Sequence, residues 1–243
     1  MTAVNLGAHG SPVILGAAMY ILYGGDFTRS GLVQWVLDEG GLAYQFRKID
    51  IVTGGNKAPE FLAINPSGLV PVLITPEGEA LTETAALMVY LADRHGLTDL
   101  APSPTDALRG QFLSAIFHLA SDVQAEMKRF HYPHRFSPRP GDNLKIQDMA
   151  KALVISRLTV IAERLAANGP YALGARFSLA DAFLSFWVAY LDREDVFRRL
   201  PPIATLYGLA RDRPKLGALL AETESASDQY AAMMKRNPEG VIR

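Results

Sequence analysis

Residues 65–82 have the sequence NPSGLVPVLITPEGEALT, and this stretch decides the fold of the first part of the chain. Val70 to Ile74 and Ala80 to Leu81 are short apolar runs on either side of Thr75-Pro76-Glu77-Gly78, which has the residues of a tight turn. The stretch therefore predicts two strands joined as a β-hairpin.

Strand and helix patterns alternate on both sides of this hairpin. The predicted elements, in order, are a strand at Tyr20–Tyr23, a helix that ends at Gly40-Gly41, a strand at Tyr44–Ile51, a helical turn at Pro59–Ala63, the hairpin, and a helix at Ala85–Asp93. The order β-α-β-α-β-β-α predicts a four-stranded mixed sheet between about Met19 and Gly96, with helices on both faces.

The rest of the sequence has helical patterns only. Helices are predicted at Leu108–Arg129, Asn143–Ala167 and Ser178–Leu191, with shorter helices before and after Pro214. We therefore divide the chain into an extension at 1–17, an α/β domain at 18–97, a linker at 98–104 and an all-α domain at 105–243. No strand pair is expected beyond Pro104.

Composition excludes several classes of function. Lys plus Arg number 24 and Asp plus Glu number 25, and this balance argues against a nucleic-acid partner, which needs a clustered basic excess. The absence of cysteine removes disulfides, thiolate nucleophiles and cysteine-ligated metals. No apolar run approaches the roughly 20 residues of a membrane span, and the start lacks the basic residues of a secretory signal. We expect a soluble, cytoplasmic protein.

Four motifs carry a resemblance to a known family. Asn65–Leu73 closely resembles the NPxGxVPxL signature of the glutathione S-transferase superfamily, and Glu83-Thr84 is similar to its Glu-Ser pair. Leu37–Tyr44 resembles the end of the family's first helix, and Ser178–Asp181 resembles the capping box of its sixth helix. The resemblance is to bacterial, serine- or threonine-like members, without an assigned class. It implies a thioredoxin-like N-terminal domain followed by an all-α domain.

The resemblance also implies a glutathione site. Pro71 would follow a cis peptide bond, which is essentially confined to proline, and the backbone of Val70 would pair with the cysteinyl part of glutathione. Glu83 would receive the ammonium group, and Thr84 would hold the γ-glutamyl carboxylate where a helix begins. Lys57 would reach the glycyl carboxylate. The alternatives are a trans proline at an edge strand, an ordinary helix start, and a solvated lysine.

Family members activate the thiol with a hydroxyl that donates a hydrogen bond to the thiolate. Thr28 lies at the first serine of the Ser-Arg-Ser stretch that Thr28-Arg29-Ser30 resembles, and Ser30 is the next hydroxyl. Tyr23 falls where the tyrosine classes have their donor. The position used by several serine and cysteine classes holds Phe27, which has no donor. We rank Thr28 first, then Ser30, then Tyr23.

The second site is less defined by the sequence. Phe117, His118 and Tyr132 are candidates for the wall of a pocket for the electrophile, although core packing also explains Phe117. The histidines at His131 and His134 do not predict a metal site, because Pro133 interrupts the spacing and no further ligand lies in place.

The sequence therefore predicts a glutathione transferase that joins the thiolate to a small electrophile in a detoxification role, acting as a homodimer. The alternatives are a glutathione-binding or scaffold protein without thiol chemistry, or a glutathione-dependent isomerase or peroxidase. Composition excludes the cysteine-dependent reductases, and the serine-serine-cysteine motif of maleylacetoacetate isomerases is absent.

Overall fold

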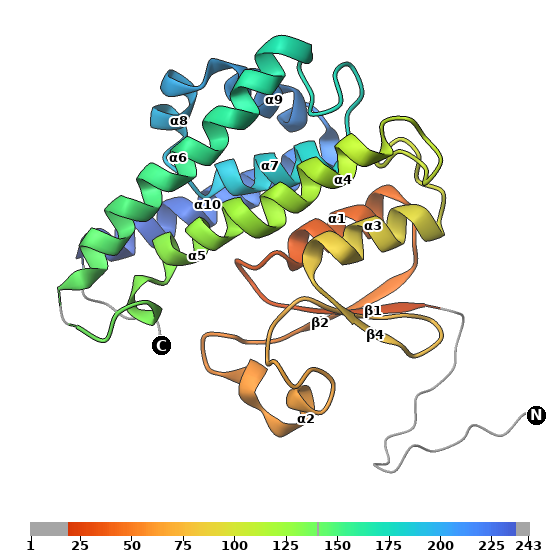
Figure 1. The fold of residues 1–243 in the computed structure, drawn as a ribbon. Helices are drawn as coiled ribbons and strands as arrows, with labels where there is room; N and C mark the ends of the chain where they lie inside the picture. Colours follow the sequence, from red (N-terminus) through yellow and green to blue (C-terminus); the bar gives the residue numbers. More distant parts are fainter. Residues whose placement is uncertain (1–18, 140, 237–243) are drawn as a thin grey trace, which may run out of the picture.

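The computed structural model describes residues 19–139 and 141–236, in which a part with a sheet is followed by a helical part (Figure 1). The predicted extension at 1–17 lies outside the described residues. The sheet and its helices, coloured red to yellow in Figure 1, lie below the green and blue helices of the second part.

Four strands form one mixed sheet in the order β2-β1-β3-β4, as predicted. β1 (Tyr20–Gly24) pairs in parallel with β2 (Tyr44–Lys48). β3 (Val72–Ile74) pairs antiparallel with both β1 and β4 (Ala80–Thr82). The hairpin predicted from residues 65–82 is therefore the pair β3–β4.

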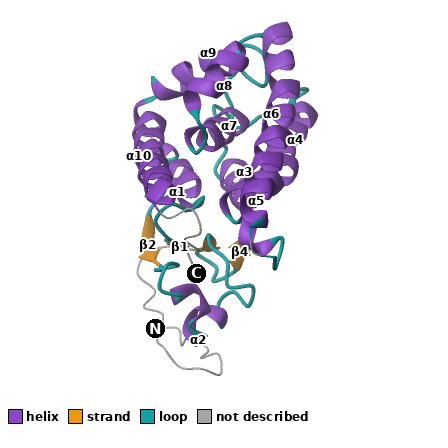
Figure 2. Cartoon of the chain, turned by 90° about the vertical axis from the view of Figure 1, so that its left-hand side faces the viewer, coloured by secondary structure: helices purple, strands orange, loops and turns teal. Residues whose placement is uncertain are grey.

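Helices cover both faces of this sheet. α1 (Ser30–Glu39) and α3 (Thr84–Arg94) lie on one face, and the short α2 (Pro59–Leu62) lies on the other (Figures 1 and 2). Neighbouring residues of a strand point to opposite faces, so Leu22 is buried in the main core whereas Tyr23 packs in a smaller cluster on the α2 side.

Two strands are shorter than predicted. β2 was expected to reach Ile51 but ends at Lys48, and the N–H of Ile49 then donates to the carbonyl of Gly24 at 2.6 Å as the chain turns away. β3 was expected from Val70 but begins at Val72, because Pro71 has no N–H to donate to a neighbouring strand.

The described chain beyond Pro104 is helical. Its helices are α4 (Arg109–His118), α5 (Gln124–His131), α6 (Asp142–Asn168), α7 (Leu179–Ala189), α8 (Arg193–Arg199), α9 (Pro201–Arg211) and α10 (Pro214–Arg236). No strand is found there within residues 105–139 and 141–236, although two isolated bridges join residues 171–176 before α7. Among the described helices, none has both the length and the apolar character needed to cross a bilayer.

The helix predicted at Leu108–Arg129 is not regular. A π-helical segment at Leu119–Val123 separates α4 from α5. In this widened turn the hydroxyl of Ser121 donates to the carbonyl of Phe117 at 2.8 Å, and a side chain that bonds into the backbone ladder is a common cause of such irregularity.

The centre of the helical part is α7, all of whose residues are buried. It begins with the predicted capping box of Ser178 and Asp181. The N–H and the hydroxyl of Ser178 both donate to the carboxylate of Asp181. Asp181 also accepts the N–H of Ala172 at 2.7 Å and is fully buried. This carboxyl therefore joins the preceding loop to the start of the central helix.

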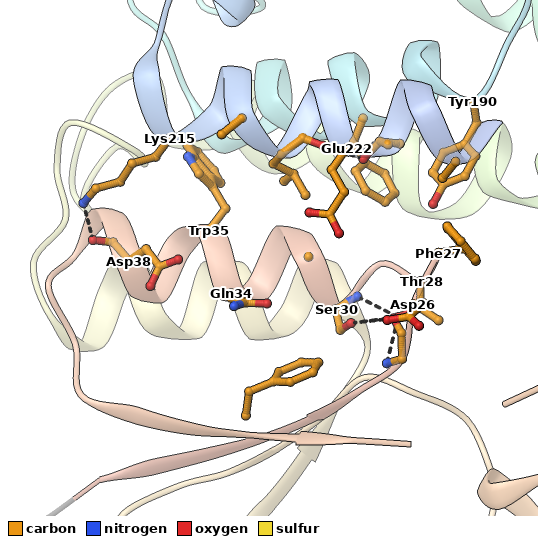
Figure 3. A pocket seen from close by; sticks show the side chains of 18 residues that line it. Asp26, Phe27, Thr28, Ser30, Gln34, Trp35, Asp38, Tyr190, Lys215 and Glu222 are labelled. Carbon is orange, nitrogen blue, oxygen red and sulfur yellow. Dashed lines mark hydrogen bonds between the residues drawn. The ribbon is translucent and has the colours of Figure 1, made fainter. Parts of the chain in front are cut away.

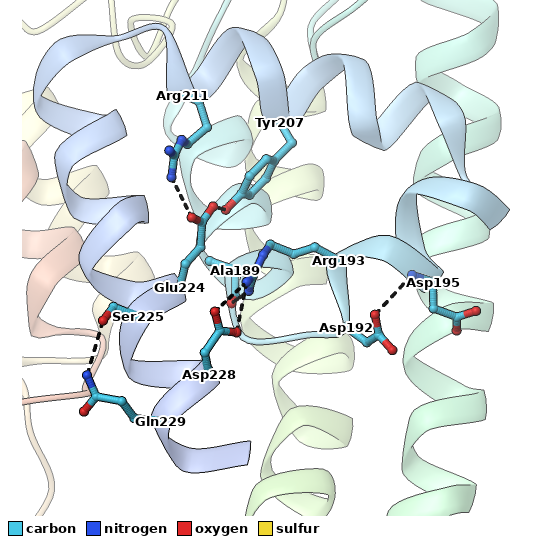
Figure 4. A network of polar contacts seen from close by, with 10 residues as sticks. All are labelled: Ala189, Asp192, Arg193, Asp195, Tyr207, Arg211, Glu224, Ser225, Asp228 and Gln229. Carbon is cyan, nitrogen blue, oxygen red and sulfur yellow. Dashed lines mark hydrogen bonds and ion pairs between the residues drawn. The ribbon is translucent and has the colours of Figure 1, made fainter. Parts of the chain in front are cut away.

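The prediction of only shorter helices around Pro214 is wrong, because α10 spans 23 residues. Figure 4 shows the polar contacts that hold it against the preceding helices. Arg193 bonds Asp228 at 3.0 Å, and Glu224 accepts from the hydroxyl of Tyr207 at 2.5 Å and from Arg211 at 2.7 Å. These contacts hold one face of α10, while another packs beside α1.

Candidate functional site

The end of β1 passes directly into the start of α1. A Cβ on Gly24 would lie 2.4 Å from both Cβ and Oγ of Ser30, so this approach requires glycine. The hydroxyl oxygens of Thr28 and Ser30 are 2.7 Å apart, and Thr28 donates to the carbonyl of Gly25 at 2.8 Å. The structure thus brings the first two predicted thiol-activating residues together.

The third candidate lies elsewhere. The ring of Tyr23 packs against Phe61 of α2, with ring centroids 6.0 Å apart, and its hydroxyl accepts a hydrogen bond from Arg47 of β2 at 2.9 Å. This hydroxyl is therefore held over β2, on the face of the sheet opposite to α1.

The loop before β3 presents free backbone groups. The Val70–Pro71 peptide bond is cis, as the resemblance implied. Two side-chain amides hold this loop. Asn65 donates to the carbonyl of Leu69 at 2.7 Å, and Asn56 donates to the carbonyl of Gly68 at 2.8 Å. In the described chain neither the N–H nor the C=O of Val70 has a hydrogen-bond partner, so both are available to an extended ligand.

The start of α3 is the second element of this site. Thr84 is 3% exposed, and its hydroxyl oxygen is buried without a partner in the described chain. Glu83 precedes it with φ 70°, a left-handed conformation that a non-glycine residue adopts mainly at turns and functional sites. Unpaired N–H groups of the first helical turn and the buried hydroxyl together fit an anion.

Lys57 lies close to the same loop. Its side chain is exposed, and a Cβ placed on Gly68 would lie 2.7 Å from its Nζ. Its ammonium is therefore next to the segment that leads to Val70. The structure thus brings Lys57, Val70 and Pro71 to one loop, and Glu83 and Thr84 to the helix start.

A groove of about 390 Å³ lies between α1 and α10 (Figure 3). At one end Lys215 of α10 donates to the carbonyl of Asp38 at 2.5 Å, and Glu222 points into the groove. At the other end lie Phe27 and Tyr190, near the Thr28 and Ser30 hydroxyls. None of the predicted glutathione-binding residues lines this groove.

The three predicted wall residues do not line the groove either. Phe117 is 50% exposed, and His118 bonds Asp122 through its Nδ1 at 2.9 Å. The ring of Tyr132 lies 4.2 Å from the guanidinium of Arg135. No hydrogen bond or ring contact joins these three residues to one another in residues 105–139.

A metal site has no support in the described part of the chain. In residues 19–139 and 141–236, no three histidine, aspartate or glutamate side chains gather as a metal would need. Burial lowers the pKa of His131 to about 4, so its imidazole is neutral at pH 7.

Arg29 was missed by the sequence reasoning. Its guanidinium lies 5.8 Å from the centre of the Trp187 ring, and its Nε is buried without a partner in the described chain. Burial lowers the pKa of Arg29, while Glu83, Tyr132 and Tyr190 act in the opposite direction. In the sequence, the position of Arg29 between two candidate hydroxyls could have indicated it, whereas nothing in the sequence indicates Tyr190, which directly follows α7.

Three comparisons place the chain among known proteins. Residues 31–94 match the family model "Glutathione S-transferase, N-terminal domain". Glutathione S-transferase 3 of Zea mays is 30% identical over 62% of this chain and 68% of its own length. A maleylacetoacetate isomerase of Rhizobium meliloti is 39% identical over 42% of this chain and 48% of its own length.

A solved structure agrees with these sequences. A glutathione transferase homologue from Sulfitobacter with bound glutathione is 30% identical, and it covers 83% of this chain and 97% of its own with a TM-score of 0.70. The cis proline, the strand order and the mostly helical second part agree with this likeness. The chain therefore belongs to the glutathione S-transferase superfamily, and its sheet is a thioredoxin-like domain.

Proposed function

We propose that this protein is a glutathione transferase, which binds glutathione and joins its thiolate to a small electrophile. The observation that carries the proposal is the joined pair of hydroxyls, Thr28 and Ser30, where β1 enters α1. A transferase among the relatives supports the proposed conjugation, and the glutathione bound to the Sulfitobacter homologue supports glutathione as the ligand.

The binding residues fit a tripeptide with a carboxylate at each end. The unpaired hydroxyl of Thr84 and the first N–H groups of α3 hold the γ-glutamyl carboxylate, and Glu83 holds the ammonium beside it. The free backbone of Val70 pairs with the cysteinyl residue, and Lys57 binds the glycyl carboxylate. These assignments place the cysteinyl sulfur toward the start of α1.

Activation follows from the two hydroxyls. Ser30 is 2% exposed, and Thr28 is half-buried with its proton on the carbonyl of Gly25 in the free protein. When glutathione binds, the Thr28 hydroxyl accepts the proton of Ser30 across the 2.7 Å contact and turns its own proton to the sulfur. This bond stabilises the thiolate over the thiol and so lowers the pKa of the thiol. The thiolate then forms a C–S bond to an electrophilic carbon, and a leaving group departs with its electron pair or, for an enone, a proton is added.

The pKa of the bound thiol tests this assignment. A hydrogen bond to a charged group contributes about 1.5–3 kcal/mol, so Thr28→Val should raise the pKa of the bound thiol by about 1–2 units while glutathione affinity changes little. Ser30→Ala should have a smaller effect, and Tyr23→Phe should have none. Thiolate absorbance against pH, with glutathione bound, measures all three variants against the wild type.

Two other results would change the assignment. If only Tyr23→Phe abolishes the lowered pKa, then the tyrosine is the donor. If the wild type itself binds glutathione without lowering the pKa, the protein is a glutathione-binding or scaffold protein. Phe27 favours this second candidate, because it holds a donor position of other classes and is 61% exposed at φ 59°.

Turnover assays separate conjugation from the related activities. A panel of aryl halides, enones, epoxides and peroxides distinguishes a transferase from a peroxidase, and a cis-enone substrate that returns as its trans isomer identifies an isomerase. We propose conjugation, because a transferase is among the relatives, while the absence of cysteine removes only a thiol–disulfide cycle on the protein itself.

We also propose that the protein is a homodimer, since an isologous pair is the commonest soluble oligomer and family members usually pair in this way. Light scattering at micromolar concentration should therefore give about twice the 26.5 kDa of one chain. A mass of one chain that does not change with concentration would contradict the dimer.

A further inference from the structure

Three hydrogen-bond donors meet where the two parts of the chain adjoin. Arg29 precedes α1, Tyr132 follows α5 and Tyr190 follows α7. The ring of His131 contacts both tyrosines, with centroids 6.5 Å from the Tyr132 ring and 5.7 Å from the Tyr190 ring. Each tyrosine also acts on the charge of Arg29. Within the described chain, the side chains of these three residues form no hydrogen bond or ion pair with the protein.

The Nε of Arg29 lacks an acceptor. Arg29 is half-buried, and this nitrogen is buried without a partner in the described chain, although buried polar groups are normally hydrogen-bonded. The ring of Trp187 supports the cation of Arg29 from one side but offers no acceptor oxygen. Arg135, over the ring of Tyr132, adds a second positive charge nearby. The cluster therefore has donors and positive charge for which this chain supplies no acceptor.

Two carboxylates lie close to the cluster without pairing with Arg29. Glu83 acts on the charge of Arg29 but forms no ion pair with it, and Glu222 acts on Tyr190 from α10. Under the proposed function, the ammonium group of glutathione binds Glu83. In the complex Glu83 would therefore be paired with an ammonium group, and the guanidinium of Arg29 would still have no ion pair from this chain.

We infer that Arg29, Tyr132 and Tyr190 bind an anionic group, of the carboxylate class, on the electrophile. Tyr190 lines the same groove as Thr28 and Ser30, so this anion would lie close to the reacting sulfur. Tyr190 also lines the end of the groove with Phe27 and Phe186, which offer apolar surface to an unsaturated body. The inference rests on the proposed function and narrows its substrates to carboxylated electrophiles such as aryl halides or enones.

Binding of two stable conjugates tests this without turnover. S-benzylglutathione and S-(4-carboxybenzyl)glutathione share the whole of glutathione and differ in one carboxylate beyond the sulfur. Calorimetric titration of the wild type should give at least about tenfold tighter binding of the carboxylated ligand, which corresponds to about 1.4 kcal/mol. The readout is the ratio of the two dissociation constants, which cancels changes that affect glutathione alone.

Variants of Arg29, Tyr132 and Tyr190 test whether these residues produce the ratio of the two dissociation constants. Arg29→Met should bring the ratio close to one, and Arg29→Lys should retain part of it. Tyr190→Phe and Tyr132→Phe should each reduce it by about threefold, because each removes one donor. Arg164→Met removes an equal charge from an exposed site on α6 and should leave the ratio unchanged.

The same titrations show which results would overturn the inference and which would overturn the proposed function. Equal binding of both ligands to the wild type would overturn the inference and leave the proposed function intact, whereas no binding of either would overturn both. If Arg29→Met weakens both ligands alike, Arg29 serves glutathione's own carboxylates or its thiolate and the inference is wrong. If circular dichroism shows that Arg29→Met is unfolded, the two tyrosine variants decide, and an unchanged ratio in both overturns it.

Discussion

Asp181→Ala should lower the free energy of unfolding by about 3–5 kcal/mol, because it leaves buried donors without an acceptor. The carboxyl of Asp181 accepts the N–H of Ala172 at 2.7 Å and both the N–H and the hydroxyl of Ser178 at 2.8 and 2.9 Å. Typical total stabilities are about 5–15 kcal/mol, so one substitution removes much of the margin. Urea unfolding followed by circular dichroism measures the change.

Another helix cap gives the matched control. Asp192 is exposed and accepts the N–H of Asp195 at 3.2 Å at the start of α8. Asp192→Ala should cost only about 1 kcal/mol, because water replaces the lost acceptor. Equal losses in the two variants would show that burial of Asp181 does not set its contribution.

The contribution of Asp181 to the free energy of unfolding should increase as the pH falls, which is opposite to the usual behaviour of a carboxylate. Burial raises the pKa of Asp181 to about 6 in the folded state, although its hydrogen bonds act in the opposite direction. Between about pH 4 and 6 the folded state then binds more protons than the unfolded state, so this group stabilises the fold at low pH and loses that effect as pH rises through 6. The stability of the wild type relative to Asp181→Asn should therefore increase by about 2 kcal/mol from pH 7 to 4.5.

Local patterns explain why most of the first part of the fold was predictable. The β3–β4 hairpin follows from Thr75–Gly78, whose turn chemistry acts within a few residues. The helices α1 and α3 follow from apolar spacing that begins and ends close to the observed bounds. The cis bond before Pro71 came from the family resemblance, and the structure confirms it.

The remaining features depend on contacts between distant segments. The length of α10 is supported by polar bonds from Arg193, Tyr207 and Arg211, which apolar spacing does not reveal. The π-helical turn at Leu119–Val123 keeps the helical pattern of the sequence around it. The meeting of Arg29 with Tyr190, 161 positions later, is a product of how α1 and α7 pack, so neither residue alone predicts the cluster.

The ranking of the thiol donors depends both on local motifs and on contacts between distant segments. Sequence placed Thr28 first from resemblance, and the structure adds that Ser30 bonds Thr28 and that Tyr23 is held by Arg47 over β2. The face on which the Tyr23 hydroxyl lies depends on the strand register of β1 with β2. That register involves residues more than twenty positions apart, which no local motif contains.

Glu83→Gln should weaken glutathione binding about tenfold or more, equal to about 1.5–3 kcal/mol. Glu83 is exposed at the start of α3, and its side chain forms no ion pair within the described chain, so its carboxylate is free to accept the ammonium group of glutathione. Glutamine keeps the size and the left-handed backbone position but removes the charge. Glu79→Gln, in the exposed turn before β4, removes an equal charge and should leave the affinity unchanged.

A second ligand assigns this loss to one contact. Glutaryl-cysteinyl-glycine is glutathione without its α-amino group, so it offers Glu83 no ammonium. Calorimetry of both ligands with both proteins forms a double-mutant cycle, in which the wild type should prefer glutathione and Glu83→Gln should show little preference. If the variant keeps the full preference for glutathione, another carboxylate binds the ammonium. Glu83 would then also remain a charged neighbour of Arg29 in the complex and would weaken the binding of a carboxylate at the inferred anion site.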